Sequence, residues 1–453
     1  MKQSRARRVA CVVSALIVLS VLGWRDWRGE RPEAFELLQL VRAQGALQVG
    51  AGKAALMPIS GVDKAGYPPR RPRADGQATP LFARALALRV GDAATLGLVS
   101  LDLLEVSEEL ADEIDRGARS LGLSAVLVTA THTHSSLGGY DRNLAVRAAA
   151  LGHFDAAQQR EIMTRSIEAL AQACARVEPA RARWSTRPLQ GLNRNRAQAD
   201  GPIDRDLRVL AFDAEASGAA IATLFSFDAH PTLVARHSAQ LDADFPGRTS
   251  ELIEVSTGAP ALFFQGAAGD AGALPPKEDA QLPKTALMAA RLSEEVSHAL
   301  ALATPLPIDA LAIARGRLAL PKAQAPATVP RFLQRPAANL LQAVLMERAP
   351  LALIRLGPLT LVAIPGEPTF FTGQNLRQAL GGEHVIFAGL AHGYVGYVES
   401  AVRREQGLGE SRRALWAPEL EARLIDGVEQ LLTALDAPDT PLSNTPSAGA
   451  DPT

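Results

Sequence analysis

The sequence has little cysteine and almost no net charge. Its two cysteines are Cys11, inside an N-terminal apolar run, and Cys174, so we expect neither an internal disulfide nor a cysteine-based metal site. The 47 lysines and arginines nearly cancel the 48 aspartates and glutamates, which leaves a formal charge of −1. Proteins that bind polyphosphate usually carry a basic excess, so this balance argues against nucleic acid as a partner.

Several motifs of common enzyme classes are also missing. The chain contains no G-x-S-x-G elbow, no H-E-x-x-H, no Walker loop and no G-x-G-x-x-G. A hydrolase built from this sequence therefore needs another arrangement of residues. Apolar residues make up 47% of the chain and charged residues 21%, a balance that predicts a folded core and excludes disorder of the whole chain.

The N-terminus has the pattern of an export signal. Four basic residues lie within positions 2–8, and the run from Val9 to Trp24 carries no charge. No A-x-A cleavage site follows, so residues 1–30 are predicted to be an uncleaved signal anchor, with a cleaved and secreted form or a buried N-terminal helix as alternatives. The positive-inside rule then predicts a protein of the bacterial inner membrane whose body faces the periplasm or the cell exterior.

Residues 31–436 are predicted to form one large mixed α/β domain, because strand-like apolar runs alternate with segments of helical period. Residues 437–453 have almost no apolar mass and are predicted to be a disordered tail. The predicted strands are Leu96–Asp102, Ala125–Thr131, Leu207–Asp213, Ala219–Phe227, Ala261–Gln265, Leu351–Arg355, Leu359–Ile364 and Val385–Gly389. The predicted helices are Glu105–Leu121, Ala156–Val177, Thr285–Leu302, Phe370–Leu380 and Pro418–Leu435.

Histidines follow two of the predicted strands. His132 and His134 end the β-branched run from Ala125, and their spacing of two places both imidazoles on one face of extended chain. Imidazole is a common zinc ligand, although two histidines that only hydrogen-bond a turn would give the same pattern. His230 ends another apolar strand. Asp244, farther along, is either an orienting partner of an imidazole or a helix cap.

Two further segments carry polar groups at strand ends. Glu367 lies in a Pro-Gly-Glu turn between a strand and a helix, where it serves either as a ligand or as a helix cap. His392, Tyr394 and Tyr397 follow the strand from Val385 in a glycine-rich loop. Two of the four tyrosines of the chain in one such loop is unusual, although a loop packed on the core would look the same.

Together these segments resemble the neutral and alkaline non-lysosomal ceramidases, zinc amidases that cleave the N-acyl bond of ceramide. The resemblance covers roughly residues 47–435, and each motif alone is weak while their common order is specific. The similar segments are Val49-Gly-Ala-Gly-Lys-Ala, Thr131-His-Thr-His-Ser-Ser-Leu-Gly-Gly-Tyr140, Asn193-Arg194, Ala229-His-Pro-Thr232, Gly269-Asp270, Pro365-Gly-Glu367 and Gly389-Leu-Ala-His-Gly-Tyr-Val-Gly-Tyr397.

The resemblance implies zinc ligands and active-site residues. It implies that His132, His230, Glu367 and Tyr397 bind Zn²⁺, an N/O set suited to this metal. It further implies that His134 and Arg194 contact the substrate amide or the developing oxyanion. Gly272 stands where the family has its active-site serine, and the family's C-terminal β-sandwich domain has no counterpart in this sequence.

From the resemblance we expect a membrane-anchored, zinc-dependent amidohydrolase that acts on an N-acyl amide of a lipid-like substrate. One alternative is a non-catalytic relative that serves as an envelope or lipid-binding protein, and the missing serine motivates it. The other is a zinc esterase or deacylase that acts on another envelope substrate.

Overall fold

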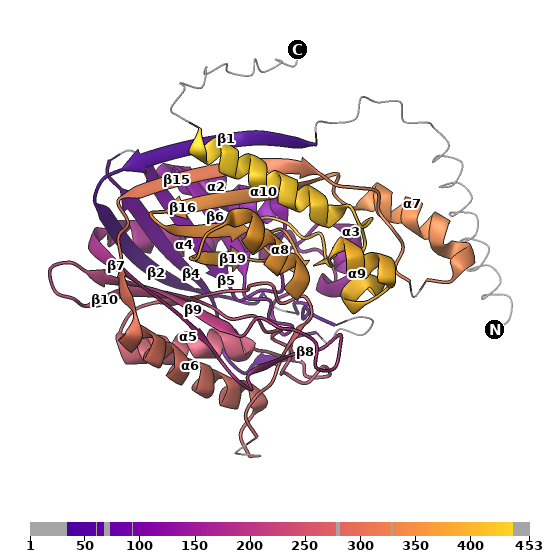
Figure 1. The fold of residues 1–453 in the computed structure, drawn as a ribbon. Coiled ribbons are helices and arrows are strands. Elements are labelled where there is room, and N and C mark those ends of the chain that lie inside the picture. The colour runs from indigo at the N-terminus through magenta and orange to yellow at the C-terminus, as the bar shows by residue number, and fades with distance from the viewer. Residues whose placement is uncertain are drawn as a thin grey trace, which may run out of the picture.

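Two β-sheets packed face to face form the centre of the fold in the computed structural model (Figure 1). The structure describes residues 34–59, 61–67, 73–92, 94–277, 281–327 and 329–437. The smaller sheet has the strand order β1 (Phe35–Gln44), β15 (Ala310–Ala319), β16 (Arg348–Leu356), β17 (Leu359–Ala363) and β19 (Val385–Ala388). The larger sheet has the order β12 (Ala261–Phe264), β10 (Ala220–Ser226), β9 (Asp206–Ala214), β7 (Glu178–Pro188), β2 (Leu47–Leu56), β4 (Leu81–Val90), β5 (Ala94–Leu101) and β6 (Ala125–Ala130), with β14 (Thr304–Leu306) paired to β7.

Both faces of the larger sheet are buried, and the residues of each strand alternate between two apolar layers. In β4, Leu86 and Leu88 point into the layer between the sheets, whereas Ala85 and Ala87 point to the outer face. This alternation follows from the period of two in a strand, which sends successive side chains to opposite faces. Strands buried on both faces read as continuous apolar runs, which made several of them visible in the sequence.

Helices cover the outer faces of both sheets and complete four layers (Figure 1). The larger sheet is covered by α2 (Glu108–Ala118), α4 (Ala156–Ala175), α5 (Asp244–Thr257) and α6 (Lys284–Leu302). The smaller sheet is covered by α8 (Phe370–Leu380) and α10 (Leu420–Asp436). The remaining short elements are β3 (Gly76–Gln77), α3 (Leu144–Val146), β8 (Asn193–Asn195), β11 (Gln240–Leu241), β13 (Ala271–Ala273), α7 (Gln334–Val344), β18 (Glu367–Pro368), β20 (Tyr397–Val398) and α9 (Ala401–Gln406).

The glycines of the Gly50-Ala-Gly52 motif let α4 lie close against β2. A Cβ on Gly50 would lie 2.1 Å from the carbonyl oxygen of Ala173, and one on Gly52 would lie 2.1 Å from that of Ala169. Real Cβ atoms do not approach so closely, so neither position accepts a side chain unless the helix moves. This part of the motif therefore serves helix-to-sheet packing.

The mixed α/β class and the single domain with flanking helices agree with the sequence prediction. Parallel pairs, such as β5 with β6 and β10 with β12, lie beside antiparallel ones in the larger sheet, so it is mixed. The eight predicted strands and five predicted helices are all present, with ends shifted by a few residues. The prediction did not include β1, which lies inside the predicted domain and pairs with β15. It also did not include the long strands β2, β4, β7 and β15.

The predicted signal anchor over residues 1–30 lies outside the described residues, as does residue 438 onward of the predicted tail. Among the helices in the described part of the chain, none has both the length and the apolar character needed to cross a bilayer.

Candidate metal centre

Three strands from the two sheets end at one place and deliver its polar side chains. His132 follows β6 and His230 follows β10, both in the larger sheet, whereas Glu367 follows β17 of the smaller sheet. His132 has a left-handed backbone with φ 70°. Such a conformation is unfavourable for a residue other than glycine and is found at functional sites where the surrounding structure holds it. The side chains of all three residues are buried.

Backbone carbonyls fix the tautomer of two imidazoles. Nδ1 of His132 lies 2.6 Å from the carbonyl oxygen of Leu104, and Nδ1 of His230 lies 2.9 Å from that of Ala268. A carbonyl oxygen only accepts a hydrogen bond, so in each neutral ring Nδ1 carries the proton and Nε2 carries a lone pair. A backbone carbonyl that binds the far nitrogen in this way is typical of histidines that bind a metal.

The free atoms of these side chains face one another. The two Nε2 atoms of His132 and His230 are 3.0 Å apart, and Oε2 of Glu367 lies 3.3 Å and 3.1 Å from them respectively. Ligand atoms about 2.0–2.1 Å from a tetrahedral zinc ion lie about 3.3 Å from each other. Two lone pairs and a carboxylate oxygen at these distances repel one another unless a cation lies among them. The donor set therefore fits zinc in both chemistry and spacing.

The surroundings keep these groups in the charge states that a metal needs. Burial, and then the nearby Arg196, lower the pKa of His230 from 6.5 to about 3. Burial would raise the pKa of Glu367, but His132 and His230 beside it hold that pKa well below its ordinary value. At neutral pH the site thus presents a neutral His230 imidazole and an ionised carboxylate, the forms that bind zinc.

His134 lies at the edge of this group. Its Nε2 is 3.4 Å from Nε2 of His132, and together with His230 the three imidazoles form a cluster that could hold a metal ion. The Tyr67 ring lies against it, with centroids 4.9 Å apart. Burial, and then the neighbouring His132, lower the pKa of His134 well below its ordinary value. Its Nδ1 is buried and has no hydrogen-bond partner among the described residues, which leaves it available to a proton or a substrate.

Tyr394 and Tyr397 flank Glu367 on both sides. The Tyr394 hydroxyl donates a 2.6 Å hydrogen bond to Oε1 of Glu367, so this oxygen is occupied while Oε2 faces the histidines. Tyr397 pairs with Glu367 through β20 and β18, and its ring lies 6.4 Å from the His230 ring. Its hydroxyl accepts a 3.0 Å hydrogen bond from Arg196. Tyr397 thus lies beside the three close donors, with its oxygen held by a cation.

Arg194 and Gly272 face each other across the β8–β13 pair. Gly272 also forms a bridge with His230, which places the expected serine position next to a ligand candidate. Arg194 is exposed, and its Cγ lies 4.0 Å from where a Cβ on Gly272 would be. The arginine that contacts the inner residues is Arg196, whose guanidinium also donates to the carbonyl oxygen of Gly269 over 2.7 Å.

Two of the alternatives weighed from the sequence are resolved toward structural roles. Asp244 begins α5 and accepts hydrogen bonds from the backbone of Leu233 and Val234, so it holds the loop after His230 and orients no imidazole. His392 accepts a 3.1 Å hydrogen bond at Nε2 from the backbone N–H of Val128. His392 lies apart from the histidine cluster and bonds the backbone of β6 through Val128.

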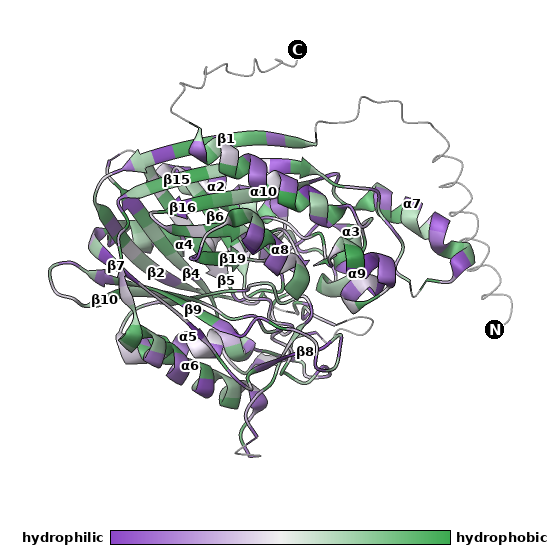
Figure 2. Ribbon diagram, in the orientation of Figure 1, coloured by the Kyte–Doolittle hydropathy of each residue, from purple (hydrophilic) through white to green (hydrophobic). Residues whose placement is uncertain are grey.

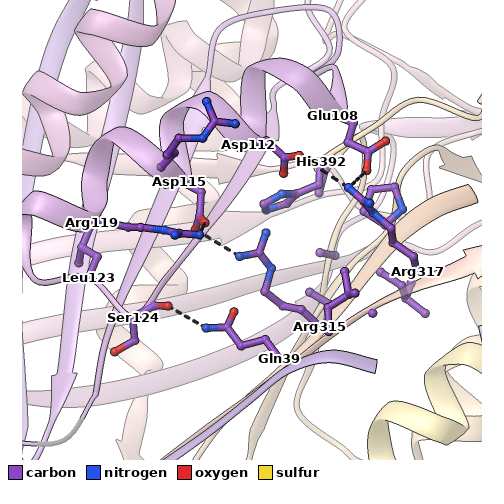
Figure 3. A pocket seen from close by; sticks show the side chains of 18 residues that line it. Gln39, Glu108, Asp112, Asp115, Arg119, Leu123, Ser124, Arg315, Arg317 and His392 are labelled. Atoms are coloured by element: carbon purple, nitrogen blue, oxygen red, sulfur yellow. Dashed lines mark hydrogen bonds and ion pairs between the residues drawn. The ribbon is translucent and has the colours of Figure 1, made fainter. Parts of the chain in front are cut away.

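His392 also reaches the wall of a separate cavity of about 520 Å³ between α2 and β15 (Figure 3). Two arginines of that cavity are paired with carboxylates, Arg315 with Asp115 at 3.2 Å and Arg317 with Glu108 at 2.5 Å. None of the residues that the resemblance assigns to the site lines it. The cavity therefore plays no part in the histidine site.

Sequence reasoning gave no role to Tyr67, Tyr394 or Arg196. A usable signal was the scarcity of tyrosine, because all four tyrosines of the chain lie in or beneath the site. The fourth, Tyr140, hydrogen-bonds the carbonyl of Glu105, the residue after the carbonyl that orients His132. No comparable signal separated Arg196 from Arg194, because both follow an asparagine in the same short segment.

Residues 47–268 match the sequence profile of the family described as neutral/alkaline non-lysosomal ceramidase, N-terminal. Among curated proteins, none matches the sequence significantly. The fold is similar to the neutral ceramidase from Pseudomonas aeruginosa, with a TM-score of 0.74, 19% identity, and coverage of 86% of this chain and 74% of that chain. It is also similar to a structure described as ceramidase complexed with C2, with a TM-score of 0.73, 20% identity, and coverage of 86% and 75%. At these identities the likeness establishes a shared fold.

Proposed function

Because this chain belongs to the neutral/alkaline non-lysosomal ceramidase family, we propose that it is a zinc-dependent hydrolase cleaving the linear amide of a lipid-like N-acyl substrate. One observation carries the proposal. Nε2 of His132, Nε2 of His230 and Oε2 of Glu367 lie 3.0–3.3 Å apart, while Nδ1 of each imidazole faces a backbone carbonyl. Such a set is costly to bury unless it binds a cation.

His132, His230 and Glu367 would hold zinc, with Tyr397 as the fourth residue at the site. When bound, zinc supplies a Lewis acid that polarises a carbonyl and makes water a stronger nucleophile at neutral pH. Tyr394 keeps Glu367 in its orientation by occupying Oε1. The carbonyls of Leu104 and Ala268 keep both imidazoles turned toward the metal.

His134 and the two arginines handle protons and negative charge. His134 is half-buried, its pKa is held well below the ordinary value, and its Nδ1 has no hydrogen-bond partner among the described residues, so a neutral ring can accept a proton and pass it to the departing amine. Arg194 is exposed and pairs with Gly272, the neighbour of His230, and from there its cation stabilises the negative charge that develops on the amide oxygen. Arg196 has a positioning role, because it holds the Tyr397 hydroxyl.

The position of Gly272 favours a second candidate, a non-catalytic envelope or lipid-binding relative. Gly272 lies beside His230, where the resemblance places a serine, so a mechanism that needs that hydroxyl is lost in this chain. A mechanism that uses activated water does not need it. The proposed location, the bacterial inner membrane with the body outside the cytoplasm, suits both candidates.

Metal content and hydrolysis of the full chain test the proposal. We expect about one zinc per chain and release of fatty acid from N-acyl amides of long acyl chain, both lost on His230→Ala. His298→Ala is the matched control, because His298 is exposed on α6, and it leaves both unchanged. Zinc retained in the His230→Ala protein overturns the ligand assignment. A zinc-loaded protein that hydrolyses neither amides nor esters favours the non-catalytic candidate.

A further inference from the structure

A long excursion separates two neighbouring strands of the smaller sheet. Ala319 at the end of β15 pairs with Arg348 at the start of β16, so these antiparallel neighbours could be joined by a tight turn. Instead residues 320–347 leave the sheet and form α7 before returning. In Figure 1, α7 projects at the right-hand edge of the molecule, away from both sheets.

The excursion exposes large apolar side chains. No residue of α7 is fully buried, and Phe332, just before it, is 80% exposed. Leu333 and Leu340 are also exposed, and a spacing of about two helical turns places Leu340 on the same side as Phe332 and Leu333. We call these three residues the apolar cap. Figure 2 shows apolar residues on α7 interleaved with hydrophilic ones.

Exposed positive charge accompanies the apolar cap. Arg331 and Arg335 are both exposed, and neither has an ion-pair partner within the described part of the chain. A short amphipathic helix with exposed apolar side chains and nearby arginines is typical of segments that lie in the interface of an anionic bilayer.

The excursion begins where the N-terminal segment enters the fold. The backbone N–H of Ala319 donates a 2.9 Å hydrogen bond to the carbonyl of Ala34, and Arg348 lies 3.5 Å from the Glu36 carboxylate. The predicted anchor ends only a few residues before Ala34. A chain anchored there brings this edge of the smaller sheet, and with it α7, close to the bilayer.

We propose that the apolar cap and its two arginines form a docking surface for the anionic lipid bilayer to which the chain is tethered. Phe332, Leu333 and Leu340 enter the interface to a depth of about 5–10 Å, while Arg331 and Arg335 contact lipid phosphates. Leu341, about 100° around the helix from Leu340, is partly buried and packs on the core of the smaller sheet.

The segment that carries the docking surface packs on a loop that reaches the histidine site. A Cβ on Gly393 would lie 3.3 Å from Pro350 and 3.5 Å from Met346, so the returning limb of the excursion packs on the loop that carries Tyr394. Tyr394 in turn holds Glu367. This consequence rests on the proposed function: docking brings the site close to a substrate held in the membrane.

Fluorescence at two matched positions tests the docking. The full chain, with Cys11 and Cys174 replaced by alanine, carries a single NBD label at Phe332→Cys or at Val255→Cys and is reconstituted into vesicles of phosphatidylcholine and phosphatidylglycerol. Val255 is the control, because it is 86% exposed on α5, on the outer face of the larger sheet. We expect a blue-shifted emission at 332, quenched by a spin-labelled lipid at least about twofold more than at 255.

Equal quenching at the two positions overturns the proposal. Replacing Arg331 and Arg335 by glutamine, or omitting phosphatidylglycerol, lowers the docked fraction by roughly tenfold, and an unchanged signal overturns the role of charge. Phe332 is exposed, so its replacement does not threaten folding. The readout contains no substrate, so a protein that docks but hydrolyses nothing refutes the proposed function and leaves the docking surface intact.

Discussion

Tyr394 binds one oxygen of the Glu367 carboxylate and leaves the other oxygen to the histidines. The tyrosine hydroxyl donates a 2.6 Å hydrogen bond to Oε1, and this leaves Oε2 facing His132 and His230. A carboxylate fixed in this way presents one oxygen to a cation without a loss of side-chain entropy at binding. Tyr394 is therefore a positioning residue for the metal centre, although it contacts no other ligand candidate.

The first prediction concerns this hydrogen bond. Tyr394→Phe removes the donor, leaves Oε1 without its partner and frees the carboxylate to turn, so we expect zinc affinity to fall by about 10–100-fold. Competition with a chelator of known affinity measures the change. Ser166→Ala is the control, because the Ser166 hydroxyl is also buried but donates to the backbone carbonyl of Ile162 within α4. It lowers stability and leaves zinc affinity unchanged; equal affinity of the Tyr394→Phe protein and wild type contradicts the positioning role.

The second prediction concerns Gly272. A Cβ there meets its nearest atom at 3.4 Å, a contact that Arg196 can relieve slightly, so Gly272→Ser should fold with the free energy of unfolding changed by less than about 1 kcal/mol. If activated water is the nucleophile, wild type hydrolyses its amide substrate already, and the added hydroxyl changes kcat by less than about tenfold. Steady-state kinetics on both proteins measures the two kcat values. Turnover by Gly272→Ser alone would mean that wild type is the non-catalytic relative.

The third prediction concerns stability against acid. Burial, and then Arg315, lower the pKa of His392 from 6.5 to about 3, so in this range the unfolded chain binds a proton that the folded chain does not. Stability therefore rises with pH between 3 and 6.5 and is lost as the pH falls through this window, at about 1.4 kcal/mol per pH unit for this one group. His392→Gln keeps an acceptor for the Val128 N–H but does not titrate.

Urea unfolding of the metal-free proteins across this pH range measures the difference. We expect the His392→Gln protein to lose less stability per pH unit than wild type, because one titrating group is gone. The other buried histidines are present in both proteins and cancel in the comparison. Parallel stability curves for the two proteins would contradict the lowered pKa of His392.

The fourth prediction concerns the packing of α4. Gly50→Ala places a methyl group 2.1 Å from the Ala173 carbonyl, so we expect the free energy of unfolding to fall by about 1–3 kcal/mol or more as helix and strand separate. Gly382→Ala is the control, because its Cβ meets nothing closer than 3.9 Å, and it should be neutral or slightly stabilising. Denaturant unfolding measures both. An unchanged free energy of unfolding in the Gly50→Ala protein would contradict the packing role of this motif.

The predictability of the fold from sequence depends on burial. Strands such as β5 and β6 are buried throughout, and their unbroken apolar runs are plain in the sequence. β1 lies at the edge of the smaller sheet, half-exposed and rich in polar residues, so its pattern gave no comparable signal. The helix α5 was hidden because it begins with a proline and a glycine in its first turn, residues that normally interrupt helices.

The site residues of rare type could be predicted from the sequence, whereas those selected by the three-dimensional arrangement of the chain could not. Histidines are scarce, so His132, His134 and His230 at strand ends were distinctive, and the structure brings them together with Glu367. The choice between Arg194 and Arg196 depends on how a three-residue strand alternates beside Gly272, and composition carries no information about this.

The three closest ligand candidates belong to different sheets, and this has a consequence for the whole molecule. His132 and His230 extend from the larger sheet and Glu367 from the smaller, while a layer of buried apolar side chains lies between the two. A cation held by all three is a cross-link between these halves. Sheet separation and metal release then become one event, so the ion should leave at the unfolding midpoint and raise the unfolding temperature as its concentration rises.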